Sequence, residues 1–428
     1  MVRAIANRQS VQAGRSNGRL RLVIAWILVV LALLPWRSQT YYSGGVDPTV
    51  AVKAVLQIVA LVLALGRALP GRLYAALGPR TLAIVFAFVL FACLGGWAAG
   101  SPVTSAILGI RILLIVATVA LLMVSYPHDV ALTSGIMVLA GVGMFCGLSG
   151  LGKVGATGRL YGGILPINPN QISLMISPLV IWLVWRMLQA QARLVEYALL
   201  VVLFATTWLT GSRTGLVGLI IGIVIVLMYA RRLPLGGMLS IIFCMPVLLW
   251  IVGFTGVIAG YVGRNGDGHV MTLSSRTIAW SAAFSAPTDF WSHWFGGGLN
   301  VTTVSVTGQW WNQQVVDSSW VSAYIQAGVV GVALLALWSF TCLTASFRAP
   351  RATRGLMIAL VVNAIIRSAL ETGLIGSFVL FVVMLIPALT CEIRPRTKPP
   401  EHIRLTQSPM QPDRNAASAA PAELNGTR

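Results

Sequence analysis

Long apolar segments alternate with short polar or basic turns from residue 20 to residue 391. A helix needs about 20 mostly apolar residues, within a range of roughly 17–25, to cross the hydrocarbon core of a bilayer. The predicted fold class is therefore all-α, a polytopic integral membrane protein with about twelve transmembrane helices. The predicted helices cover residues 20–36, 50–66, 81–99, 103–124, 130–150, 172–189, 194–210, 214–230, 235–258, 319–345, 355–370 and 373–391.

One long polar window, residues 258–320, separates the ninth predicted helix from the tenth. It carries charged residues and two histidines, His269 and His293, interleaved with tryptophans such as Trp280 and Trp294. A loop of this length between two spans is usually functional. We predict that the window forms the lid and the acceptor side of an active site that faces out of the cell.

The composition excludes a soluble globular protein. Hydrophobic residues make up 57% of the 428 residues and charged residues 10%, and the mean hydropathy is +0.83. All five cysteines fall in or at the end of apolar segments, which predicts neither a disulfide framework nor a metal site. The first apolar segment is followed by further spans, so we expect no cleavable signal peptide. Residues 1–19 form a basic N-terminal tail and residues 392–428 a polar C-terminal tail, and we expect both to be disordered.

The net charge of +19 invites a nucleic-acid partner, but the distribution of the basic residues argues against one. Basic residues gather in alternate loops, as the positive-inside rule requires. Both termini are therefore predicted to be cytoplasmic and the 258–320 window extracytoplasmic. The predicted inside loops carry Arg67, Arg72, Arg80, Arg186, Arg193, Arg231, Arg232, Arg348, Arg351 and Arg354, whereas the outside segments carry Arg37, Lys153, Arg159, Arg213, Arg264 and Arg276.

Several cations fall in the outer half of predicted spans. Arg111 lies eight residues into the fourth span, about 12 Å below its outer edge at about 1.5 Å per residue. An arginine at such depth costs about 2.5–3.5 kcal/mol, so it needs a partner or a wet cavity. With Lys53, Arg367 and the outside arginines Arg159, Arg213 and Arg276, it predicts an anion site, for which a lipid diphosphate is the simplest ligand. Local pairing, such as Arg367 with Glu371 at the i,i+4 spacing, is the alternative.

Local motifs could be structural or functional. The segment Ser274-Ser275-Arg276 predicts a capped amphipathic helix, and Asp317-Ser318-Ser319 predicts a cap for the tenth span. Asn170 or Ser173 could cap the sixth span. None of these caps requires a function.

Four motifs in order resemble one known family. They are Arg159…Gly162…Asn168-Pro169-Asn170, then Thr210-Gly211-Ser212-Arg213, then Ser275-Arg276…Trp280 followed by Gly296-Gly297-Gly298, then Asp317-Ser318-Ser319-Trp320…Gly328…Gly331. This pattern is similar to that of the O-antigen ligase and O-antigen polymerase superfamily of bacterial envelope glycosyltransferases. The resemblance implies that Arg213, Arg276 and Arg159 engage the diphosphate of a polyprenyl-linked glycan donor, and that catalysis needs no metal or other cofactor.

The chain departs from the family's ligases at one place. Where ligases carry His-Asn at the start of the tenth span, this chain has Asp317-Ser318. The ligase-type base is therefore missing, or its place is taken by Asp317, which is the candidate general base; His269, His293 and Glu371 are the other candidates. The departure favours a polymerase over a ligase.

The predicted function is a membrane glycosyltransferase at the outer face of the bacterial cytoplasmic membrane. It would move a polyprenyl-diphosphate-linked glycan onto a glycan or lipid-glycan acceptor, in the biosynthesis of cell-surface polysaccharide. Asp317, Arg213 and Arg276 are the predicted catalytic residues, and Arg159, Arg213, Arg276, Arg111 and Arg367 the predicted diphosphate ligands. A transporter or flippase for a lipid-linked or anionic solute is the alternative, and it would need polar groups down to the cytoplasmic side.

Overall fold

A computed structural model describes residues 2–36, 48–66, 78–230, 274–286, 289–306 and 312–392 of the protein. These residues are mostly helical, with one small antiparallel sheet. The elements are α1 (Val2–Leu33), α2 (Pro48–Leu65), α4 (Pro79–Ala98), α5 (Pro102–Ser125), α6 (His128–Leu148), η1 (Leu151–Lys153), α7 (Val154–Thr157), α8 (Pro169–Leu188), α9 (Leu194–Leu209), α10 (Arg213–Met228), α13 (Ser274–Ser285), α14 (Phe290–Phe295), β1 (Thr303–Ser305), β2 (Gln313–Val315), α15 (Ser319–Phe347), α16 (Arg354–Leu370) and α17 (Val379–Glu392).

Eleven of the twelve predicted spans coincide with helices, and the ninth, at 235–258, lies outside the described residues. Two boundaries differ from the prediction. α1 begins at Val2, so the segment expected to be disordered is helical; it is rich in alanine and arginine and has no proline to stop a helix. α17 begins at Val379 rather than residue 373, because Gly373 adopts a positive φ of 95° in the preceding turn.

Five described helices are long and apolar enough to cross a membrane, namely α4, α5, α6, α8 and α15. Shorter apolar helices accompany them, including α9, α10 and α17. This composition supports a membrane protein, while the count of twelve spans stays a prediction.

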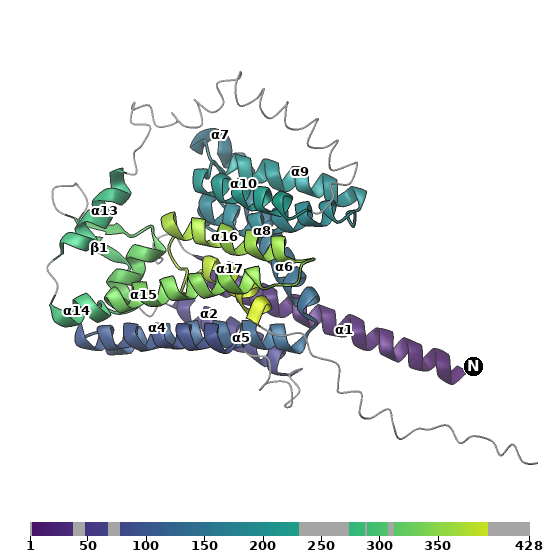
Figure 1. Ribbon diagram of the computed structural model, residues 1–428, viewed down its shortest axis with the longest axis horizontal. Helices are drawn as coiled ribbons and strands as arrows, with labels where there is room; N and C mark the ends of the chain where they lie inside the picture. The colour runs from purple at the N-terminus through teal and green to yellow at the C-terminus, as the bar shows by residue number, and fades with distance from the viewer. Residues whose placement is uncertain are drawn as a thin grey trace, which may run out of the picture. The chain divides into compact units, whose positions relative to one another are not determined.

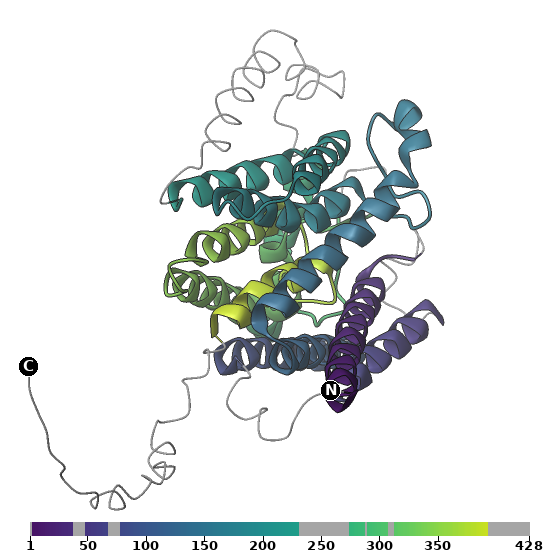
Figure 2. The same cartoon turned by 90° about the vertical axis from the view of Figure 1, so that its right-hand side faces the viewer.

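The helices pack in layers (Figures 1 and 2). α15 and α16 lie side by side, with α4 and α5 on one side and α9 and α10 on the other. α17 packs against α4, α5, α6, α8, α15 and α16. Every residue of α17 from Val379 to Leu389 is buried, which explains why its sequence is apolar on all faces.

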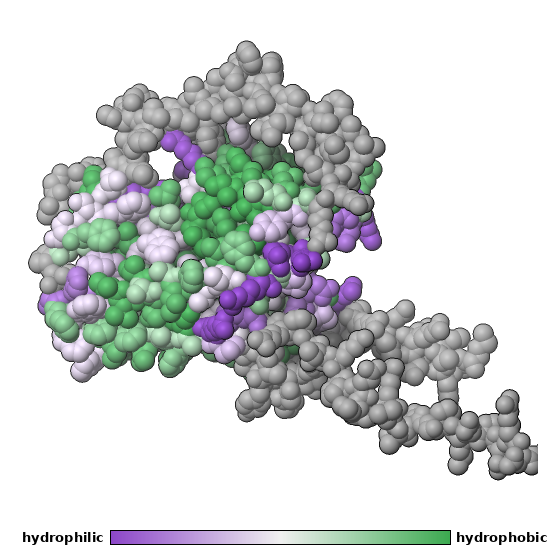
Figure 3. Space-filling model, viewed as in Figure 1, coloured by the Kyte–Doolittle hydropathy of each residue, from purple (hydrophilic) through white to green (hydrophobic). Residues whose placement is uncertain are grey.

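Large apolar side chains also cover the outside of the bundle (Figure 3). Leu194, Val195, Val201 and Met228 are more than two-thirds exposed on α9 and α10. Exposed apolar surface this extensive marks contact with lipid or a partner, and it agrees with a membrane location.

A glycine-dependent break in α15 organises one end of the bundle. Gly328 has φ 64° and ψ −158°, values essentially restricted to glycine, and it interrupts the helix between Ser319 and Phe347. The break frees two carbonyl groups, so that Gly297 donates its N–H to Ile325 O at 2.8 Å and Gly298 donates to Gln326 O at 3.0 Å. The described segment at Gly297 and Gly298 is thereby fixed to α15.

Candidate functional site

A cavity of about 490 Å³ opens where the segment between α6 and α8 meets α13 and the turn between α16 and α17. Its size suits a small ligand or one or two sugar rings. Its polar and charged lining consists of Lys153, Thr157, Tyr161, Asn168, Asn170, Gln171, Arg276, Asp317, Glu371 and Thr372.

The start of α8 forms one wall of this cavity. Pro169 at the first helical position sets the entry angle, and the Asn168 side chain accepts the Asn170 N–H at 3.0 Å. Asn168 is therefore the cap, and the prediction of Asn170 or Ser173 in that role is wrong. Freed from capping, Ser173 faces α16 and accepts a hydrogen bond from Arg367 at 3.1 Å.

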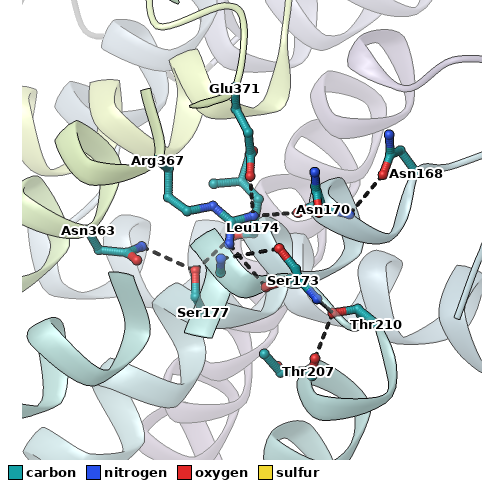
Figure 4. A network of polar contacts seen from close by, with 12 residues as sticks. Asn168, Asn170, Ser173, Leu174, Ser177, Thr207, Thr210, Asn363, Arg367 and Glu371 are labelled. Carbon is teal, nitrogen blue, oxygen red and sulfur yellow. Dashed lines mark hydrogen bonds and ion pairs between the residues drawn. The ribbon is translucent and has the colours of Figure 1, made fainter. Parts of the chain in front are cut away.

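Behind this wall lies a fully buried arginine, Arg367 of α16 (Figure 4). Its guanidinium pairs with Glu371 at 2.7 Å and donates to Ser173 Oγ and to the Asn170 carbonyl oxygen. The i,i+4 pairing of Arg367 with Glu371 is thus confirmed. A buried charge needs such a partner, because removing an unpaired guanidinium from water is costly.

A second ion pair lines the cavity. Arg276, in the first turn of α13, lies 3.5 Å from Asp317, measured between Nε and Oδ2. Asp317 precedes α15 but does not cap it, since the N-cap residue is Ser318. The side chain of Ser318 makes no capping hydrogen bond either. About half of the Asp317 side chain, 49%, is open to solvent. Burial of the rest still raises the pKa of Asp317, against the lowering effect of Arg276.

Glu371 is the more buried of the two carboxylates in the cavity. It follows the last residue of α16, and its backbone carbonyl accepts the Ser319 hydroxyl at 2.6 Å. The pKa of Glu371 is raised to about 7 by burial, the largest cause, together with Asp317, against the lowering effect of Arg367 and Arg276. The cavity therefore holds two carboxylates in unequal surroundings, the arrangement that separates a proton acceptor from a permanent anion.

The six predicted cations do not converge on one point. Arg276 lines the cavity, together with Asp317. Arg159 lies behind the α8 wall, where it donates to Asn170 Oδ1 at 3.2 Å and to the Thr210 carbonyl at 3.1 Å. The remaining four stand apart from the lining. Arg367 is buried, Arg213 is exposed in the first turn of α10, Lys53 is half-buried in α2, and Arg111 donates to Ala32 O of α1 at 2.7 Å.

Some lining residues were missed by the reasoning from sequence. Lys153 was counted among the basic residues of the outside segments but not proposed for the site, and Gln171 was not singled out. Both line the cavity. Lys153 could have been found by its position, because it precedes the motif that begins at Arg159 by six residues. Among the described residues, no group of three or more histidine, cysteine or acidic side chains could hold a metal ion.

Comparisons with models of known protein families and with curated proteins yield no match for this chain. The resemblance to the O-antigen ligase and polymerase superfamily therefore rests on the motifs alone and stays a prediction.

Proposed function

We propose that this protein is a membrane glycosyltransferase that polymerises or transfers a polyprenyl-diphosphate-linked oligosaccharide for cell-surface polysaccharide biosynthesis. The observation that carries the proposal is the cavity that joins Arg276 and Lys153 to two carboxylates, Asp317 and Glu371. Glycosyl transfer from a diphosphate needs both kinds of group within one site, because negative charge develops on the leaving group while the acceptor loses a proton.

Each charged group has a role in this reaction. An acceptor hydroxyl attacks the anomeric carbon, and the bond from that carbon to the diphosphate oxygen breaks. Arg276 and Lys153 stabilise the charge that gathers on the diphosphate, and the planar guanidinium of Arg276 can donate two parallel hydrogen bonds to it. Arg159 supports the site indirectly, through Asn170 on the cavity wall.

The proposed topology puts this cavity at the outer face of the bacterial cytoplasmic membrane. With about twelve spans and both termini cytoplasmic, the segment between α6 and α8 and the window that contains α13 both fall outside. The donor is a lipid and the acceptor a glycan or lipid-glycan, so a site at the membrane surface is accessible to both.

A gene deletion tests the proposal and separates its two forms. Envelope glycans of the deletion strain, sized on a gel, should lose long chains while single repeats stay attached if the protein is a polymerase. Loss of all attached glycan identifies a ligase instead. A full, unchanged ladder of chain lengths in the deletion strain would refute the glycosyltransferase.

A further inference from the structure

The two carboxylates of the cavity differ in burial and in the arginine with which each one pairs. Asp317 is half exposed and pairs with Arg276, the cation proposed to face the diphosphate. Glu371 is almost fully buried as a residue, yet it lines the cavity. Its neighbour Arg367 is fully buried and does not line the cavity, so that cation is not available to a ligand.

Building on the proposed function, we propose that Glu371, rather than Asp317, accepts the proton of the acceptor hydroxyl, and that Arg367 is the positioning residue that holds Glu371 in place. The acceptor oxygen forms the new bond to the anomeric carbon, and its proton passes to a Glu371 carboxylate oxygen. The electron pair of the broken bond leaves on the diphosphate oxygen. Glu371 then returns its proton to water in the cavity, so the step balances without a further reactant.

The polar contacts around Arg367 support a positioning role (Figure 4). Arg367 joins α16 to α8 through the Asn170 carbonyl and the Ser173 hydroxyl, while it pairs with Glu371 at 2.7 Å. On the other side, the Ser319 hydroxyl donates to the Glu371 carbonyl and accepts the Leu374 N–H at 3.0 Å. Side chain and backbone of Glu371 are thus both fixed, as an efficient proton acceptor requires.

The charged groups facing Glu371 determine how activity should depend on pH. Burial and Asp317 before α15 raise the pKa of Glu371, Arg367 of α16 and Arg276 of α13 lower it, and the net result is a pKa of about 7. The acceptor form is the carboxylate, so the rate should fall as pH drops through about 7. Lys153 and Tyr161 line the same cavity and remain unchanged in every variant below.

The test uses full-length protein in liposomes that contain the lipid extract of a deletion strain, with glycan product measured from pH 5 to pH 9. Glu371→Gln should lower the rate at least about 100-fold and abolish its pH dependence. Asp317→Asn should keep the fall in rate at low pH, here called the pH-dependent limb. The limb should move to lower pH, because removing a neighbouring negative charge lowers the pKa of Glu371. Arg367→Met should move the limb to higher pH by about one unit or more, which a purely structural residue would not do.

Loss of folding must be separated from loss of catalysis. The double variant Arg367→Met/Glu371→Gln leaves no unpaired buried charge, so it should remain folded by gel filtration and be inactive. A matched control is Arg186→Met/Glu196→Gln, which removes another ion pair of 2.7 Å, outside the cavity, and should leave the pH profile unchanged.

Two outcomes overturn the inference while the proposed function stands. One is a folded Glu371→Gln or double variant with more than about a tenth of wild-type activity, since a lost general base costs at least about 100-fold. The other is loss of the pH-dependent limb in Asp317→Asn. Absence of product from the wild-type protein would instead refute the glycosyltransferase itself.

Discussion

Replacing Gly328 by alanine should destabilise the whole end of the bundle that carries the site. Gly328 has φ 64° and ψ −158°, where a residue with a Cβ is strained whatever space surrounds it. There is also no space: a Cβ at Gly328 would lie 2.3 Å from the Trp294 carbonyl carbon and 2.5 Å from Phe295 N. These neighbours are backbone atoms, so they cannot rotate away.

The size of the effect follows from these contacts. Strain in this region of φ/ψ space costs about 1–3 kcal/mol. Moving the α14 end away from α15 also breaks the two bonds that Gly297 and Gly298 donate to α15, each worth about 0.5–1.5 kcal/mol. Together the free energy of unfolding should fall by roughly 2–6 kcal/mol.

The assay is unfolding by denaturing detergent, followed by helical circular dichroism, on purified Gly328→Ala. Gly141→Ala is the matched control, because Gly141 lies in α6 and its added Cβ would meet nothing within 4 Å. The control should be neutral or stabilised by up to about 1 kcal/mol, the gain in helix propensity from glycine to alanine. Equal stability of the two variants would refute the role given to the break in α15.

Two further predictions concern the site and the topology. Arg276→Ala should lower glycan transfer about 100-fold or more, with poor recovery in Arg276→Lys, whereas Arg213→Ala, outside the cavity lining, should lose less; equal losses in product formation would place Arg213 in the site. In a cysteine-free background, Gly155→Cys should react with an impermeant maleimide in whole cells and Gln191→Cys should not, and the reverse labelling would invert the proposed orientation.

The helices could be predicted from sequence because their signal is local. An apolar segment of about 20 residues specifies a buried or membrane helix without reference to the rest of the chain. The Arg367–Glu371 pair was accessible for the same reason, since an i,i+4 spacing brings two side chains together on any helix. The start of α17 was misplaced, because the conformation of Gly373 is not visible in hydropathy.

The composition of the cavity could not be predicted, because it depends on contacts between distant segments. Arg276 and Asp317 are 41 residues apart, and only the packing of α13 beside the start of α15 brings them together. Arg213 belongs to a predicted motif but does not reach the cavity. A Cβ at Gly215 would lie 2.3 Å from the Arg367 guanidinium, so the face of α10 that packs on α16 is the one with Gly215, and Arg213 is exposed. The orientation of that first turn follows from packing and not from the motif.

The transporter alternative makes a different demand on the interior. A pathway needs polar groups from the outer cavity to the cytoplasmic side. Glu371 follows the end of α16, and α16 itself continues the polar series with Arg367 and Asn363. Asn363 donates to Ser177 of α8 at 3.2 Å, but one turn farther α16 presents the buried Ala359 and α8 the buried Ile181. Within the described part of these two helices, the polar series therefore ends at Asn363 and Ser177.

This end point yields a last prediction. In the double variant Ser177→Ala/Asn363→Leu, both partners of one buried hydrogen bond become apolar, a change that can be nearly neutral for stability. If the protein is a glycosyltransferase with its chemistry in the outer cavity, glycan transfer should stay within about twofold of wild type, because neither residue lines that cavity. If Asn363 and Ser177 instead line a solute pathway, the same folded variant should lose transport. Apolar side chains would then replace the only polar contact between α8 and α16 at that level of the described helices.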